Sequence, residues 1–382
     1  APHIWSTIPK EAWNAVTVDG HIYAIVPMKD LADTNPMFYD PVFCEKYNLK
    51  VPEANTWTSL YEWVDFIYAA KEARDKEYPE LANMPIFTGG NFQFTFFYPY
   101  EEIIGPAAIT IPGMEHFFED KGSGDIVFNV FDTPEYLQYC KQMRKFVEDG
   151  IMPQDAINFN KDGKIDLKAP FALAQGEVVP RLLSGWTDCA ISESKYKVMN
   201  TTYVRAMLNC ISSNTKYPER CLMVLDLVNE DQLIGTMLRF GVENVDWKRL
   251  NDKQITFKGT TNEDPKNYTY YHWYGAQWGS IVNMLVPENV DPIFQQKIKD
   301  LVNQANKRTA LGFAFDAKPV QNEIAACRNV ISEYHDLLKY GMLDDVEGNV
   351  AEFVAKLKEN GVQKIIDEAQ RQLDEWRKAA GR

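Results

Sequence analysis

The stretch that most constrains the fold is residues 19–28, Asp-Gly-His-Ile-Tyr-Ala-Ile-Val-Pro-Met. Asp19-Gly20 is a strong tight-turn dipeptide, because glycine adopts a positive φ without steric cost. Residues 22–26 are almost wholly apolar and rich in β-branched and aromatic side chains, which predicts a strand buried on both faces. Pro27 ends that strand, since it has no N–H to donate to a ladder.

Length and composition indicate a large globular protein. At 382 residues the chain exceeds one ordinary core and suits two domains. A net charge of -14 and a pI near 5.0 argue against a nucleic-acid surface, which needs a basic stripe. The apolar runs are too short to span a bilayer. No signal-peptide or lipobox-type start is present, so we expect that a secreted form has lost that segment.

The predicted elements follow an α/β order with a helical C-terminal end. Apolar spacing and capping residues predict helices over residues 56–76, 132–149, 218–229, 291–307, 319–340, 349–359 and 361–379. Short strands are predicted over 84–88 and 207–212, and a strand with a loop over 176–191. No repeat or flexible linker separates them, which favours two lobes joined by crossing strands.

The six cysteines, Cys44, Cys140, Cys189, Cys210, Cys221 and Cys327, form no C-x-x-C and no histidine-supported zinc spacing. Their even number permits disulfides, but their wide scattering favours buried free thiols.

Residues 158–169 match most of an EF-hand-type calcium loop, with Gly163 in sixth place. The twelfth place holds Ala169 instead of a bidentate Glu, so a polar turn is favoured over a metal site.

Several segments resemble bacterial extracellular solute-binding proteins of family 1, in particular the sugar-binding lipoprotein subgroup. The first is residues 19–28 with the 38–60 segment that follows. The most specific is residues 211–231, which begins Ile-Ser-Ser-Asn-Thr-Lys-Tyr-Pro-Glu. Residues 312–324, with Gly-Phe-Ala-Phe-Asp and Pro-Val-Gln-Asn-Glu-Ile, and the ending from residue 340 are similar to that subgroup. Residues 241–247 depart from its usual pattern.

The resemblance implies a type II periplasmic-binding-protein-like fold, with two interleaved α/β lobes and a cleft between them. The N-terminal lobe would take residues 1–25 and 206–312, and the C-terminal lobe residues 26–205 and 313–382. Family members usually carry a β-α-β segment before the first crossover. This sequence starts just before that crossover, so we expect either a shortened chain or a lobe completed in another way.

The function implied is capture of a carbohydrate, by preference an oligosaccharide, through hinge closure and its delivery to an ABC permease. We expect an extracellular or periplasmic monomer, anchored as a lipoprotein, without cofactor, metal or nucleic-acid partner. Pyranose rings pack on aromatic faces while Asp, Asn and Lys side chains bind hydroxyls. The candidate ligand-binding residues are Lys29, Asp30, Asn91, Phe94, Trp186, Asp188, Trp273, Tyr274, Trp278 and Asp316.

Each candidate also has a simpler interpretation. The tryptophans are equally explained as core rings, and Lys29 with Asp30 as a surface ion pair. No catalytic signature is present: there is no G-x-S-x-G, H-E-x-x-H, P-loop or dinucleotide fingerprint. Glu101 and Glu102 could suggest a glycosidase, but in an acidic chain such a pair predicts solvated surface. A binder of peptides or other polar solutes remains the main alternative, ahead of a glycoside-active enzyme.

Overall fold

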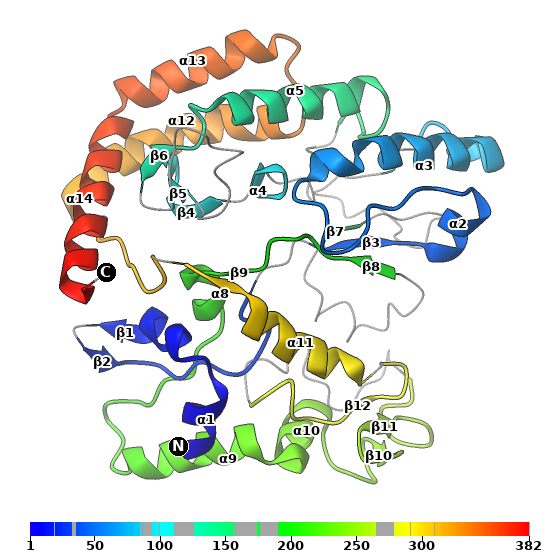
Figure 1. Ribbon diagram of the computed structural model, residues 1–382, viewed down its shortest axis with the longest axis vertical. Helices are drawn as coiled ribbons and strands as arrows, with labels where there is room; N and C mark the ends of the chain where they lie inside the picture. Colours follow the sequence, from blue (N-terminus) through cyan, green and yellow to red (C-terminus); the bar gives the residue numbers. More distant parts are fainter. Residues whose placement is uncertain are drawn as a thin grey trace. The chain divides into compact units, whose positions relative to one another are not determined.

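The computed structural model describes residues 1–18, 20–32, 36–84, 86, 94–98, 100–110, 126–155, 157, 174–175, 190–264, 279–290, 292–308 and 310–381. The chain divides into two compact units (Figure 1). Unit 1 holds the described residues of Ala1–Thr34 and Tyr196–Lys307. Unit 2 holds those of Asn35–Gly176, Asp188–Lys195 and Arg308–Arg382. The lobe boundaries at 25, 205 and 312 stay a prediction.

Unit 1 combines short helices with small sheets. The helical elements are α1 (Pro2–Thr7), η1 (Lys10–Val16), α8 (Thr201–Arg205), α9 (Pro218–Glu230), α10 (Gln232–Phe240) and α11 (Ile293–Gln304). Strands β1 (Thr17–Val18) and β2 (His21–Ile22) pair antiparallel, and β9 (Val198–Met199) pairs parallel with β13 (Asn306–Lys307). A third sheet orders β10 (Lys248–Arg249), β11 (Gln254–Thr256) and β12 (Val286–Pro287).

Unit 2 packs longer helices against two antiparallel sheets. Its helical elements are α2 (Pro41–Lys46), η2 (Leu60–Trp63), α3 (Val64–Glu77), η3 (Pro79–Leu81), α4 (Phe94–Phe97), α5 (Pro134–Glu148), η6 (Lys318–Val320), α12 (Gln321–Lys339), α13 (Val346–Glu359) and α14 (Val362–Ala380). One sheet has the order β7 (Ala174–Gln175), β3 (Met37–Tyr39), β8 (Ala190–Ser192). The other orders β4 (Tyr100–Ile104), β5 (Ala107–Thr110) and β6 (Val127–Asn129).

The predicted helices are confirmed where local capping signals defined them. Thr133 caps α5 by accepting a hydrogen bond from the Tyr136 N–H, and Gly150 follows the helix with φ +67°. In the 56–76 segment, Ser59 and Glu62 form a capping box at the start of η2. The three C-terminal helices lie as expected, and α5 packs beside α12 and α13 (Figure 1).

The predicted strand over residues 22–26 is wrong, and its predicted burial is confirmed only in part, because Ala24 and Val26 are buried whereas Ile22 and Tyr23 are exposed. β2 ends at Ile22, and both of its residues are exposed. Beyond it the pairing continues only as a single bridge between Ile25 and Asn209. That bridge is also the only β pairing that the structure gives to the described segment 207–212, which was predicted as a strand. Apolar composition alone did not predict which residues are exposed, because burial on both faces also needs neighbouring strands, and among the described residues Ile22 has only β1 beside it.

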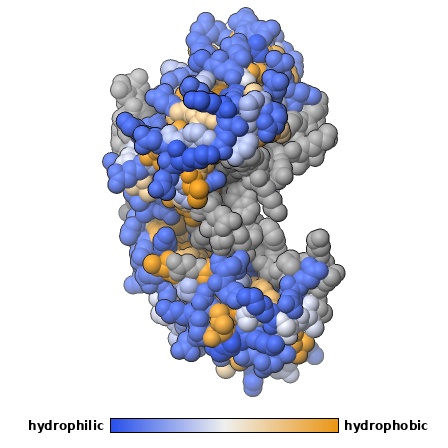
Figure 2. Space-filling model, turned by 90° about the vertical axis from the view of Figure 1, so that its right-hand side faces the viewer, coloured by the Kyte–Doolittle hydropathy of each residue, from blue (hydrophilic) through white to orange (hydrophobic). Residues whose placement is uncertain are grey.

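Aromatic side chains form most of the core of unit 2. Tyr136 and Tyr139 on α5 are fully buried, and Trp57 and Trp63 pack edge to face with ring centroids 5.6 Å apart. Unit 1 has a smaller cluster around Phe240, Trp247, Ile255 and Leu285. The face in Figure 2 is mainly hydrophilic among the described residues, with hydrophobic side chains in small separate patches. None of the described helices combines the length and apolar character needed to cross a membrane.

The described cysteines are free thiols. Cys44, Cys140 and Cys327 are buried, and burial raises the pKa of Cys44 and Cys140 to about 12 and that of Cys327 to about 11. These thiols therefore stay protonated and unreactive at neutral pH. Cys189 lies outside the described residues.

We expect His335 to make unit 2 sensitive to acid. Its Nδ1 lies 3.1 Å from the Tyr136 hydroxyl, and burial, with Lys339 acting in the same direction, lowers the His335 pKa to about 4. The unfolded chain takes up a proton near pH 6.5, so stability is complete above that pH and is lost as the pH falls toward 4. The free energy of unfolding, measured in urea, should fall between pH 7 and pH 4.5 in the wild type. We expect this fall to be about 1–3 kcal/mol larger than in His335→Asn. The exposed His21→Gln variant should keep the wild-type pH dependence, and a His335→Asn variant with unchanged pH dependence would contradict this assignment.

Candidate functional site

Four of the predicted ligand-binding residues, Lys29, Asp30, Phe94 and Asp316, are described by the structure. Asn91, Trp186, Asp188, Trp273, Tyr274 and Trp278 lie outside the described residues, as does the calcium-like loop at 158–169. Lys29 and Asp30 belong to unit 1, whereas Phe94 and Asp316 belong to unit 2. The role of the whole set in ligand binding stays a prediction.

Lys29 is buried within unit 1, with only 4% of its surface exposed. Its Nζ donates to the carbonyl of Tyr203 at 2.8 Å and lies 5.8 Å from the centre of the Tyr203 ring. Tyr203 belongs to the short helix α8, so the ammonium joins the segment after Ile25 to that helix. A second contact runs from Nζ to the carbonyl of the half-buried Asp30, at 3.5 Å. The interpretation of Lys29 and Asp30 as an exposed surface pair is therefore wrong.

Phe94 is buried in the aromatic core of unit 2. Its ring centroid lies between 5.3 and 5.5 Å from those of Tyr98, Tyr100, Tyr136 and Tyr139. These contacts come from α5, from β4 and from the end of α4. In this structure the Phe94 ring serves packing, and a direct contact with a ligand stays a prediction.

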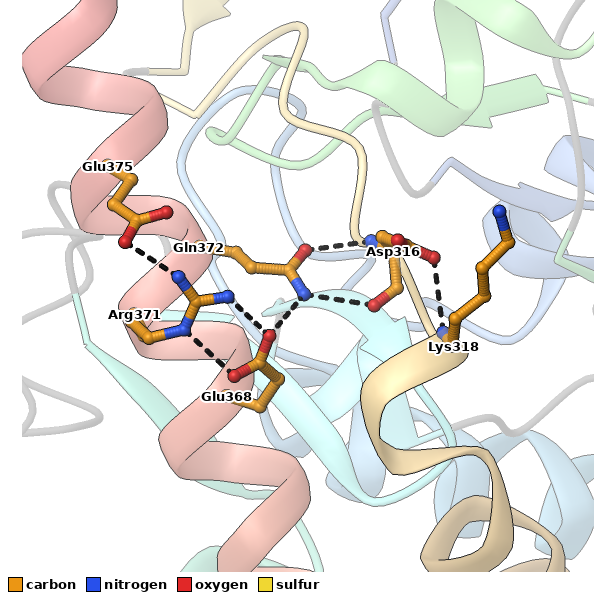
Figure 3. Close-up of polar contacts among 6 residues, drawn as sticks. All are labelled: Asp316, Lys318, Glu368, Arg371, Gln372 and Glu375. Carbon is orange, nitrogen blue, oxygen red and sulfur yellow. Dashed lines mark hydrogen bonds and ion pairs between the residues drawn. The ribbon is translucent and has the colours of Figure 1, made fainter.

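Asp316 is exposed, and its backbone is held by α14 (Figure 3). The Gln372 amide accepts from the Asp316 N–H at 2.8 Å and donates to the Asp316 carbonyl at 2.9 Å. The Asp316 carboxylate accepts from the Lys318 N–H at 3.1 Å, which turns the chain into η6. Gln372 is itself fixed by Glu368, whose pKa is lowered to about 2, chiefly by its hydrogen bonds from Arg371. These contacts fix the backbone at Asp316.

Sequence reasoning missed a buried ion pair in unit 2. Arg308 donates to Glu101, and only 1% of the Arg308 side chain and 9% of the Glu101 side chain are exposed. Burial lowers the pKa of Arg308, and the Glu101 carboxylate opposes that effect. Glu101 had been predicted as solvated surface, and that prediction is wrong. The two residues lie far apart in sequence, so no local pattern pairs them.

The positions of Glu101 and Glu102 on β4 argue against the two residues acting together as the carboxylate pair of a glycosidase. Glu101 and Glu102 are consecutive on β4, and side chains alternate between the faces of a strand. Glu101 is buried, whereas Glu102 is exposed. Two carboxylates on opposite faces cannot flank one glycosidic bond, as a glycosidase requires. Among the described residues, no group of three His, Cys, Asp or Glu side chains is placed to hold a metal ion.

We expect the Arg308–Glu101 pair to matter for stability because removing one partner leaves a buried charge. Glu101→Leu should lower the free energy of unfolding by about 3–5 kcal/mol, and Glu101→Leu combined with Arg308→Met should recover part of that loss. Denaturant unfolding measures both. In the matched control Glu11→Leu, which removes the exposed pair with Lys307, the change should stay below about 1 kcal/mol. Equal losses in Glu101→Leu and Glu11→Leu would contradict the prediction.

We also expect Gln372 to hold the Asp316 loop. Gln372→Ala should speed hydrogen exchange at the Asp316 amide and cost about 1–3 kcal/mol of unfolding free energy, because its two hydrogen bonds with Asp316 and the one to Glu368 are lost. The control is Gln363→Ala on the same helix, since Gln363 bonds only to Asp367 within α14 in the described contacts. Unchanged exchange at Asp316 in Gln372→Ala would show that the loop is held by other contacts.

Comparison with known proteins gives matches in sequence and in fold. A family model described as "Domain of unknown function (DUF3502)" matches residues 309–378. A protein named "Carbohydrate ABC transporter substrate-binding protein" from Streptococcus pneumoniae serotype 4 is 24% identical over 379 residues, which is 95% of this chain and 71% of that protein. This chain is therefore similar over nearly its whole length to a carbohydrate ABC transporter substrate-binding protein. The resemblance predicted from the sequence is thus confirmed.

Solved structures of solute-binding proteins have a fold similar to that of this chain. The N-glycan transport solute binding protein (NgtS) from Streptococcus pneumoniae superposes with a TM-score of 0.76 at 20% identity, covering 98% of this chain and 80% of that chain. Structures of NgtS with Man1GlcNAc and with Man5GlcNAc give TM-scores of 0.73 and 0.71, at 20% and 19% identity, and cover 98% and 99% of this chain and 80% of those chains. The predicted type II periplasmic-binding-protein-like fold is confirmed.

The family-model match coincides with a defined part of the structure. Residues 309–378 contain Asp316, η6, α12, α13 and most of α14. They also contain the Gly-Phe-Ala-Phe-Asp segment on which the lipoprotein-subgroup resemblance depended. The contacts between Gln372 and Asp316 lie wholly within these matched residues.

Proposed function

We propose that this protein is the substrate-binding component of a carbohydrate ABC importer and that its ligand is an oligosaccharide. The observation that carries the proposal is similarity over nearly the whole chain, in sequence to a carbohydrate transporter's binding protein and in fold to NgtS. NgtS has been solved with Man1GlcNAc and Man5GlcNAc. Oligosaccharides of mannose and N-acetylglucosamine are therefore the first ligands to test.

The proposed ligand contacts are those expected from the sequence. Sugar rings present C–H faces that pack on aromatic side chains, for which we propose Trp186, Trp273, Tyr274, Trp278 and Phe94. Hydroxyl groups need donors and acceptors, for which we propose Lys29, Asp30, Asn91, Asp188 and Asp316. Binding needs no covalent step, and the proposal assigns no catalytic residue.

The importer supplies the remaining partners in the proposal. The protein acts outside the cell as a monomer anchored as a lipoprotein, and it delivers its ligand to the membrane permease subunits. Capture follows the lobe closure implied by the family, with lobes of 1–25 with 206–312 and of 26–205 with 313–382. A binder of peptides or other polar solutes is the second candidate, because the fold alone does not select the solute.

We expect Man5GlcNAc to raise the thermal unfolding midpoint by several degrees. A ligand at about 100 times its Kd stabilises the native state by about 2.7 kcal/mol, because it binds the folded chain and not the unfolded one. Trp273→Ala and Trp186→Ala should weaken binding at least about tenfold by isothermal titration calorimetry. Tyr217→Ala, which removes an exposed ring outside the proposed set, should leave the affinity unchanged.

The choice of solute decides between the candidates. A series of unlabelled oligosaccharides and a mixture of short peptides should be titrated under the same conditions. Binding of an oligosaccharide without loss of the intact sugar over hours supports the importer proposal. Binding of peptides alone would overturn the carbohydrate assignment, and release of monosaccharide would favour a glycoside-active enzyme.

A further inference from the structure

No further inference is drawn: the strongest candidate, the apolar pocket of unit 1 that residues of α1, η1, β2 and α9 line, carries none, because nothing in the structure shows what covers it.

Discussion

Edge-to-face and tilted packing around Tyr136 is the interaction on which most of unit 2 depends. Its ring contacts Phe94 on α4, Phe131 before α5, His335 on α12 and Phe353 on α13. Each partner comes from a different segment, so one buried ring sets the relative placement of several elements. Such pairs are directional as well as apolar, which restricts their geometry more than aliphatic contacts would. The phenol also places its hydroxyl at the His335 ring, so packing and the pH response of the unit have the same origin.

Two of the candidate ligand-binding residues, Asp316 and Lys29, are held in place by contacts with residues that lie elsewhere in the chain. Asp316 is oriented through its backbone by Gln372, which is held in turn by Glu368 and Arg371. Lys29 is buried against Tyr203, so any effect it has on a sugar includes its effect on α8. A binding protein that performs no chemistry depends on such orientation, since rigid side chains lose less entropy when a ligand binds.

Unit 1 keeps several large apolar side chains at its surface. Trp5 is 57% exposed although its ring packs beside that of Trp13, and Ile22 is 48% exposed although its backbone pairs with Thr17 in the β1–β2 sheet.

The sequence by itself determined the helices and the relation to solute-binding proteins. Capping residues such as Thr133 and Glu62 act on groups a few positions away, so their effect is visible in a linear pattern. Only the tertiary structure decided burial. Glu101 was expected on the surface and lies inside because Arg308 pairs with it from a distant segment. Residues 22–26 were expected inside, and Ala24 and Val26 are buried, yet Ile22 and Tyr23 are exposed because a strand is buried on both faces only when other elements cover it.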